Sequence, residues 1–336
     1  MGIFNRSSND TIPIWFMRQA GRYLDGYRKI RLSVNSFLDL CYDPVMASTV
    51  TLEPIQRFDF DAAIIFSDIL VLPHSLGWDV TFEKEVGPVL RQFKSQDDMA
   101  RFDLRRIGNL QKVYEAINNV RAKLPKDKSL IGFAGAPWTV CSYLLEGGSS
   151  KKFISSKKLI YQDRDLVKNL IDFITQHTIQ HLLGQIKAGA DVLQIFDSWA
   201  GMLSGDEYFE FVINPTTHIV EAIKKEYPNI PVIGFPRCSG FLYEDYINRT
   251  KIDIIGVDQF VPIDVMAKWS KKIVVQGNLD PITLLSSSEL IIKKVNDIME
   301  QLHGKNFIFN LGHGILPETP TDNVQLVIDY VRKFKK

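Results

Sequence analysis

A short apolar segment that ends next to a small or polar residue recurs along the chain, and a longer stretch with helical spacing follows most copies. Strands that alternate with helices pair in parallel through right-handed crossovers. Strands that are apolar at almost every position belong to a sheet covered on both faces. The segments with this pattern are residues 61–66, 130–133, 191–196, 231–235, 253–257, 272–276 and 306–310.

These segments predict an α/β protein, a single (β/α)8 TIM barrel domain over residues 1–336. Seven or eight strand–helix units in about 300 residues suit such a barrel. The eighth strand is expected near residues 86–90 or in a less regular segment. A doubly wound nucleotide-binding sheet is disfavoured, because the chain has neither a GxGxxG nor a GxxxxGK[ST] motif. No linker or shift in composition marks a domain boundary.

Polar or small residues follow each predicted strand. Asp68 follows the first strand, Ser198 the third and His313 the seventh. In a barrel these positions meet at the C-terminal face of the strands, where barrel enzymes build their sites. Asp and Ser are also ordinary helix N-caps, so one such position alone carries little information. The repetition after all seven strands predicts an active-site cleft at this face.

The charge balance restricts the partners of the chain. Lys and Arg number 40 against 39 Asp and Glu, a net charge of +1, so no overall field attracts nucleic acid or a membrane. No apolar run approaches the roughly 20 residues of a membrane span, and no secretion signal is expected. The three cysteines are widely spaced without a CxxC pair, which favours a reducing compartment. We expect a cytoplasmic protein that binds any anionic ligand through a local cluster of charge.

Such a cluster lies in residues 14–32, where aromatic side chains alternate with Arg18, Arg22, Arg28 and Arg31. A solvated basic helix face is the simplest alternative. Against it, no acid lies within four residues of Arg18, and a glycine between the first two arginines weakens a helix. Arginine binds carboxylate or phosphate through two parallel hydrogen bonds, and flanking aromatic rings pack on flat ligands. The segment therefore predicts a receptor for a planar, polyanionic small molecule.

Two further residues are candidates for chemistry, and three others are not. Asp68 has apolar neighbours, so it is either a cap or a buried carboxylate whose pKa is prone to rise. His313 stands between two glycines, which let a ligand approach the backbone. His177 and His181 share a helix face, but no third ligand completes a metal site. Cys238 also lacks partners at metal-ligand spacing, and we predict structural roles for these three residues.

Seven short motifs occur in the order and rough spacing of one enzyme family. Residues 13–24 read PIWFMRQAGRYL and residues 132–140 read GFAGAPWTV, and FSDIL, YLLEGG, FDSWAG, QGNLDP and NLGHGI accompany them. The chain resembles the uroporphyrinogen decarboxylase family over about residues 11–335. The resemblance implies a (β/α)8 barrel, a homodimer, and no metal or organic cofactor. It also implies the removal of four acetate carboxyls from uroporphyrinogen III as carbon dioxide, which gives coproporphyrinogen III for haem synthesis.

The resemblance also implies roles for individual residues. Arginines would bind the acetate and propionate carboxylates, backbone groups between them would line the same wall, and three further side chains would contact the carboxylates or the ring edge. The substrate-binding arginines are Arg18, Arg22 and Arg31. The backbone groups are those of Gln19, Ala20 and Gly21, and the three further side chains are Tyr143, Ser198 and His313. Asp68 would accept hydrogen bonds from the pyrrole N–H groups. We add an apolar floor formed by Phe66, Phe133 and Phe196.

Asp68 is the predicted catalytic residue. An acetate carbanion is too unstable to form directly, so protonation of the pyrrole at an α-carbon must first create a cation that accepts the electrons. An anionic Asp68 beneath the N–H groups would stabilise this cation. Arginine is a poor acid because of its high pKa, which leaves a substrate carboxyl or water as the proton donor.

Two other functions remain alternatives. A zinc-dependent methyltransferase of the cobalamin type would share the barrel and build a zinc–thiolate site from His-x-Cys and a distant Cys. Here Pro236 stands at the position of that histidine, although Cys238 stands where the decarboxylase family leads us to expect a small residue. A porphyrin carrier would bind a tetrapyrrole without releasing carbon dioxide. Zinc content and product formation distinguish the three functions.

Overall fold

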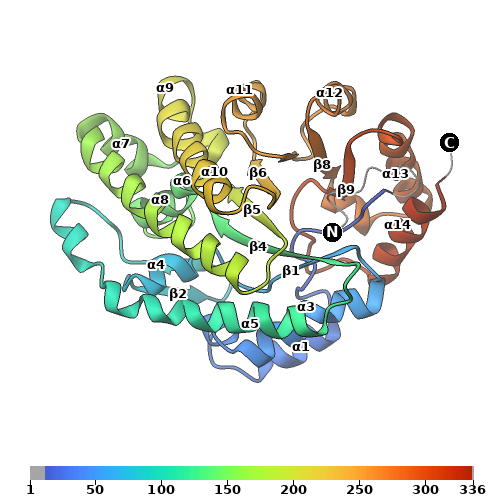
Figure 1. Cartoon of the computed structure of the whole chain (residues 1–336), viewed down its shortest axis with the longest axis horizontal. Coiled ribbons are helices and arrows are strands. Elements are labelled where there is room, and N and C mark those ends of the chain that lie inside the picture. Colours follow the sequence, from blue (N-terminus) through green and yellow to red (C-terminus); the bar gives the residue numbers. More distant parts are fainter. Residues whose placement is uncertain (1–11, 335–336) are drawn as a thin grey trace.

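The computed structural model describes residues 12–334, in which helices surround a curled parallel sheet (Figure 1). Seven strands run in the order β1–β4–β5–β6–β7–β8–β9, and each neighbouring pair is parallel. Their bounds are β1 Ala62–Ile64, β4 Ser129–Gly135, β5 Val192–Asp197, β6 Val232–Pro236, β7 Ile254–Gly256, β8 Val274–Leu279 and β9 Phe307–Leu311. Each overlaps one of the seven predicted segments, so these predictions are confirmed.

Helices cover the outer side of the sheet (Figure 1). The α-helices are α1 Asp25–Leu32, α2 Phe37–Cys41, α3 Pro44–Phe58, α4 Val71–Ser75, α5 Leu110–Lys123, α6 Pro137–Glu146, α7 Ile154–Gln162, α8 Arg164–Lys187, α9 Gly205–Tyr208, α10 Asn214–Glu226, α11 Leu242–Arg249, α12 Ile263–Trp269, α13 Ser288–Leu302 and α14 Thr321–Lys333. Short 3₁₀ helices span Gln96–Arg101, Leu104–Asn109, Ala200–Met202 and Pro281–Leu285, and a π-helical turn spans Phe209–Ile213. Within residues 12–334, no helix combines the length and the apolar character needed to span a membrane.

The position between β9 and β1 is taken by the N-terminal segment. Ile14 forms a parallel bridge with Phe309 of β9, and the carbonyl of Ile14 accepts the N–H of Asp61, one residue before β1, at 3.0 Å. The Asp61 carboxylate in turn accepts the N–H of Ile14 at 2.8 Å. The place of an eighth strand is thus filled by an irregular segment and not by a regular paired strand. A less regular segment was one of the two places expected for the eighth strand.

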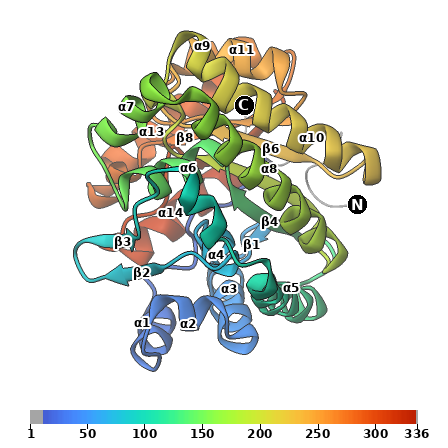
Figure 2. The same cartoon turned by 90° about the vertical axis from the view of Figure 1, so that its left-hand side faces the viewer.

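The other expectation, an eighth barrel strand near residues 86–90, is wrong. This segment does form a strand, β3 Gly87–Leu90, but it pairs antiparallel with β2 Val80–Glu83 as a separate two-stranded hairpin. Figure 2 shows the hairpin at the side of the molecule, apart from the main sheet. Local β-propensity marks a strand, whereas the choice of partner depends on tertiary packing.

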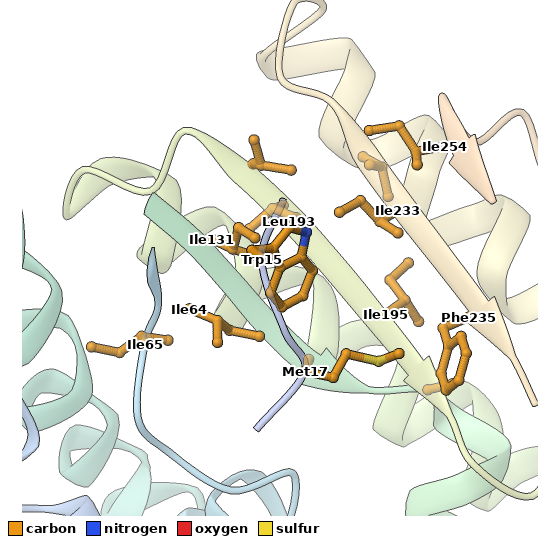
Figure 3. Packing of buried hydrophobic residues seen from close by; sticks show 14 of the residues in the cluster. Trp15, Met17, Ile64, Ile65, Ile131, Leu193, Ile195, Ile233, Phe235 and Ile254 are labelled. Atoms are coloured by element: carbon orange, nitrogen blue, oxygen red, sulfur yellow. The ribbon is translucent and has the colours of Figure 1, made fainter. Parts of the chain in front are cut away.

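Buried side chains of the N-terminal segment join the interior of the sheet. Trp15 and Met17 lie among the buried aliphatic side chains of the strands (Figure 3). The indole N–H of Trp15 donates to Gln276 Oε1 at 2.9 Å, Gln276 Nε2 donates to Gln194 Oε1 at 3.3 Å, and Gln194 Nε2 reaches Met17 Sδ at 3.7 Å. Buried polar groups need such partners, so this chain of contacts ties the N-terminal segment to β5 and β8.

Candidate active site

Arg18 is held in place by bonds on both sides of Met17. The N–H of Met17 donates to Asn310 Oδ1 and its carbonyl accepts the N–H of Ile315, both at 3.0 Å. Arg18 itself has φ +61°, a left-handed conformation that costs free energy for a residue with a side chain. A Cβ added to Gly314 would lie 3.0 Å from both Cβ and Nε of Arg18. The stem of Arg18 therefore packs over a glycine at the end of the loop that follows β9.

Gln19, Ala20 and Gly21, between the two arginines, are all buried. Gln19 is fully buried, its Nε2 donates to the carbonyl of Ala62 at 3.1 Å, and its own carbonyl accepts the hydroxyl of Tyr23 at 2.8 Å. The stretch is a series of turns that ends before α1, so Arg18 and Arg22 do not lie on a solvated helix face.

The charges of three arginines act on Tyr27. Burial raises the pKa of Tyr27, and the charges of Arg31, Arg22 and Arg18 oppose that rise. None of these three arginines forms a salt bridge with an acid of residues 12–334. Arg28 differs, because it pairs with Asp25 on the same helix. Arg18, Arg22 and Arg31 thus keep their charge available for a ligand.

Asp68 both caps a turn and faces this cluster. Its Oδ1 accepts the N–H of Leu70 at 2.8 Å. Burial raises the pKa of the Asp68 carboxyl, while the bond from Leu70 and the charge of Arg18 act in the opposite direction. The capping and functional interpretations of Asp68 are therefore compatible, since one oxygen serves the turn and the charge of the group lies within reach of Arg18.

Tyr143 lies on α6, and the charges of Asp68 and Arg18 both act on it. Burial raises the pKa of its hydroxyl, hydrogen bonds with Trp199 and Ser149 lower it, the charge of Asp68 raises it and that of Arg18 lowers it. The rings of Tyr143 and Trp199 meet edge to face with centroids 6.2 Å apart. Pro137 begins α6 and Gly147, with φ +76°, ends it. The helix thereby directs Tyr143 toward both Asp68 and Arg18.

Ser198 is positioned by a buried acid that the sequence analysis did not single out. Asp197 ends β5 and is fully buried, and its Oδ1 accepts the hydroxyl of Thr139 at 2.5 Å. Burial raises the pKa of Asp197 to about 7, and the bond from Thr139 opposes the rise. The same hydroxyl accepts the N–H of Trp199 at 3.1 Å. These bonds hold the turn in which Ser198 lies half-buried.

His313 is a neutral hydrogen-bond donor. Burial, Arg237 and Arg18, in that order of effect, lower the pKa of the imidazole to about 3. Its Nδ1 lies 2.6 Å from the N–H of Gly314 and accepts it. A neutral imidazole that accepts at Nδ1 carries its proton on Nε2. His313 can therefore donate from Nε2 to a carboxylate without carrying a charge.

Arg237 is the residue of this cluster that the sequence analysis missed. It directly follows β6, and its charge, like that of Arg18, lowers the pKa of His313. Its Nε is buried and has no hydrogen-bond partner. The signal was available in the sequence, because Arg237 has the same position after an apolar strand as Asp68 and Ser198.

The apolar residues divide into two groups. Phe133 and Phe196 meet edge to face with centroids 5.4 Å apart, and Phe235 of β6 extends the row at 6.1 Å from Phe196. Phe66 instead packs near Tyr27, at 5.6 Å. Two of the three predicted floor residues thus lie together on adjacent strands, and Phe66 joins the arginine side of the site.

The histidines on α8 have partners within the protein. His177 Nδ1 lies 2.8 Å from the carbonyl of Phe173, and His181 Nε2 lies 2.9 Å from Nε2 of Gln185. Burial lowers the pKa of His181 to about 4. Cys238 is exposed. Within residues 12–334, His, Cys, Asp and Glu side chains form no group of three or more that could hold a metal ion.

Solved structures with a similar fold include a methyltransferase from Methanosarcina mazei. It superposes with a TM-score of 0.75 at 18% sequence identity and covers 97% of this chain and 94% of its own. A B12-independent methionine synthase from Shewanella follows with a TM-score of 0.58 at 10% identity. These likenesses show a shared α/β fold of the TIM-barrel kind and nothing about chemistry.

Sequence comparison extends to chemistry. The family model described as uroporphyrinogen decarboxylase matches residues 1–334. A protein of Rickettsia africae named uroporphyrinogen decarboxylase is 54% identical over 331 residues, which are 98% of this chain and 96% of the relative. The protein of that name from Rickettsia canadensis is 52% identical and covers 98% of both chains. This chain therefore belongs to the uroporphyrinogen decarboxylase family and is a carboxy-lyase.

Proposed function

We propose that the cluster around Asp68 binds uroporphyrinogen III and removes its four acetate carboxyls without a metal or organic cofactor. One observation carries the proposal: the charges of Arg18, Arg22 and Arg31 all act on Tyr27, and none of these arginines forms a salt bridge with an acid of residues 12–334. The charge of Arg18 also acts on the Asp68 carboxyl. Such a region favours a ligand with many negative charges. A row of aromatic rings nearby suits the flat faces of a tetrapyrrole.

The roles of the binding residues follow from their chemistry. The three guanidinium groups pair with acetate and propionate carboxylates, and His313 donates from Nε2 to another. The hydroxyls of Tyr143 and Ser198 donate to carboxylates at the ring edge. Backbone groups of Gln19, Ala20 and Gly21 line the same wall and contact the substrate. The set of residues thus binds the rim of the macrocycle, while Asp68 serves its centre.

Asp68 stabilises the cation on which the reaction depends. A proton adds to the pyrrole α-carbon next to the acetate, and the ring becomes positively charged. The bond between the acetate methylene and its carboxylate then breaks, carbon dioxide leaves, and the electron pair neutralises the ring. A second proton converts the resulting exocyclic methylene to a methyl group, and the first proton leaves the α-carbon. Asp68 accepts the pyrrole N–H bonds, which strengthen as the ring becomes cationic.

The environment of Asp68 favours this role. Burial raises its pKa, which means that water solvates the anion poorly. A poorly solvated carboxylate gains more from an approaching cation than an exposed one does, because the local dielectric constant is lower. Leu70 and Arg18 oppose the shift and so favour the anionic form that the mechanism requires.

Anaerobic incubation of the metal-free protein with uroporphyrinogen III tests the activity. Chromatography of the oxidised products should show porphyrins with seven, six, five and four carboxyls in succession. Unchanged substrate would overturn the proposal. Binding without carbon dioxide release would then favour a carrier, and zinc in the untreated protein would favour the methyltransferase alternative.

The variant Asp68→Asn tests the catalytic role. We expect a folded protein that loses turnover by roughly 100-fold or more, comparable to the loss of a key electrostatic group in other enzymes. Asp103→Asn is the matched control, because Asp103 also accepts the N–H two residues ahead, from Arg105 at 3.1 Å, in an exposed position. A near-normal rate for Asp68→Asn would exclude Asp68 as the catalytic residue.

We further propose that the protein is a homodimer in the cytoplasm. Three large apolar side chains follow adjacent strands: Phe241 is fully exposed, Phe260 is 68% exposed and Ile282 is 65% exposed. A second copy of this chain would remove them from water. In a sedimentation experiment, the wild type should be a dimer. The double variant with Phe241→Ser and Phe260→Ser should be a monomer. A monomeric wild type would overturn the proposal.

A further inference from the structure

The loop after β6 contains an arginine that no motif marks. Arg237 is fixed by its backbone on both sides, since its N–H donates to the carbonyl of Asp197 and its carbonyl accepts the N–H of Gly201, both at 3.0 Å. The side chain is half-buried, yet its Nε is buried without a partner and the guanidinium forms no salt bridge with an acid of residues 12–334. A buried donor without a partner is costly, and a bound ligand would relieve that cost.

A buried carboxylate close by does not neutralise Arg237. Asp258 is 1% exposed, and its Oδ2 accepts the N–H of Cys238 at 2.5 Å and the hydroxyl of Tyr243 at 3.0 Å. Its Oδ1 accepts the N–H of Phe260 at 2.9 Å. Both oxygens are thus bound to neutral donors. Asp258 shapes the loop and leaves the charge of Arg237 available.

The bond to Cys238 has a specific effect on the loop. Cys238 has φ +60°, a left-handed conformation that is unfavourable for a residue with a side chain. The N–H of Cys238 donates to the Asp258 carboxylate, and Asn278 Nδ2 donates to the backbone carbonyl of Asp258 at 2.8 Å. The turn that directs Arg237 therefore depends on a chain of contacts through β8.

Strand order places Arg237 opposite the other arginines. If the N-terminal segment is counted between β9 and β1, β6 stands four places away from it in either direction. Arg18 belongs to that segment and Arg237 follows β6, and both lower the pKa of His313. Both charges therefore act on the same site from different sides. A macrocycle with carboxylates around its whole rim needs cations on more than one side.

We propose that Arg237 binds a carboxylate on the side of the macrocycle opposite Arg18 and Arg22, and that Asp258 is the positioning residue that sets its direction. This inference rests on the proposed function of the site. Because one guanidinium serves one carboxylate, the loss of Arg237 weakens binding of the octacarboxylate substrate and leaves the chemistry at Asp68 intact.

The variants Arg237→Gln and Arg237→Lys test the inference with uroporphyrinogen III. We expect Arg237→Gln to raise KM by about tenfold, the effect of about one charged hydrogen bond, with kcat within about twofold. Arg237→Lys keeps the charge and should recover part of the loss. Arg249→Gln is the control, because Arg249 lies at the far end of α11 and pairs with Asp245 at 3.5 Å. An unchanged KM for Arg237→Gln would overturn the inference.

Asp258→Asn tests the positioning role, and Tyr243→Phe replaces it if the asparagine variant does not fold. Either change should raise KM in the wild-type background and have little further effect in Arg237→Gln, because it acts through the arginine. Equal effects in both backgrounds would overturn the positioning role. Failure of the proposed function is distinguishable, because the wild type would then release no carbon dioxide.

Discussion

The two arginine-bearing walls of the site are built in different ways. The N-terminal wall carries Arg18, Arg22 and Arg31 in a short stretch. Met17, next to Arg18, is bound to the Asn310 side chain of β9 and to Ile315 in the loop that follows. The wall after β6 carries Arg237 alone, and a buried carboxylate shapes its turn. Because three arginines of the first wall lie close together in the sequence, the sequence alone identifies that wall. The second is a single arginine, so only its position after an apolar strand marks it in the sequence.

The two walls show how an arginine side chain remains free to bind a ligand. Arg28 lies in the same stretch as the other N-terminal arginines, but Asp25 pairs with it. Arg237 has an acid nearby that is fully occupied by neutral donors. The number of arginines in a segment is therefore a poor guide to its binding capacity, and the absence of a pairing acid is a better one.

The largest effect is expected at Arg18. Arg18→Gln should lower kcat/KM by about 100-fold. The charge of Arg18 acts on Asp68, Tyr143 and His313. A charged hydrogen bond is worth about 1.5–3 kcal/mol, so the loss of this arginine should exceed the loss of one such bond. Steady-state kinetics measure the loss. Arg28→Gln is the control and should change kcat/KM by less than about twofold. A loss at Arg18 no larger than that at Arg237 would break the distinction between the two walls.

A smaller effect is expected at the glycine beneath Arg18. An added Cβ in Gly314→Ala would lie 3.0 Å from the stem of Arg18, so the arginine must shift. Small displacements of a binding group are costly, and we expect kcat/KM to fall by about tenfold. Gly108→Ala is the control, because no atom lies within 4 Å of its added Cβ. Full activity in Gly314→Ala would show that the position of Arg18 tolerates movement.

The smallest effect concerns the charge of His313. Burial and the two arginines lower its pKa to about 3, so ¹⁵N spectra should show a neutral imidazole with its proton on Nε2 between about pH 5.5 and 8. Arg237→Gln should raise this pKa more than Arg18→Gln, and burial should keep it below 6.5 in both. Spectra of His313→Gln assign the signal. A titration with a midpoint near 6.5 in the wild type would contradict the prediction.

The same shift makes stability depend on pH. The folded protein has a lower pKa at His313 than the unfolded chain, so the unfolded chain binds more protons as the pH falls below about 6.5. The contribution of His313 to the free energy of unfolding is therefore present above that pH and is lost as the pH falls toward 3. Denaturant unfolding at several pH values, compared with His313→Gln, measures it.

The sequence predicted the sheet well because each strand is an almost continuous apolar run. It did not predict the N-terminal segment between β9 and β1, because Ile14 forms only one bridge and its partner, Phe309, lies near the other end of the chain. Residues 86–90 have the composition of a strand, but composition does not specify the partner. Long-range pairing is decided by packing, which a single sequence does not reveal.

The site was predicted unevenly for the same reason. Arg18, Asp68, Tyr143 and His313 occur in distinctive motifs, and the charge of Arg18 lowers the pKa of each of the other three. The buried role of Gln19 was not expected, because its partner Ala62 is 43 residues away. Local patterns identify the residues that carry charge, and they miss the uncharged contacts that direct them.

The bond between Met17 and Asn310 spans 293 residues of sequence. During synthesis, Arg18 leaves the ribosome long before Asn310 and Ile315, which anchor the backbone beside it. Contacts between such distant residues form late and slowly. We therefore expect nascent chains that stop before β9 to fold part of the sheet and to remain unable to bind substrate, so that competence appears only when the last strand is complete.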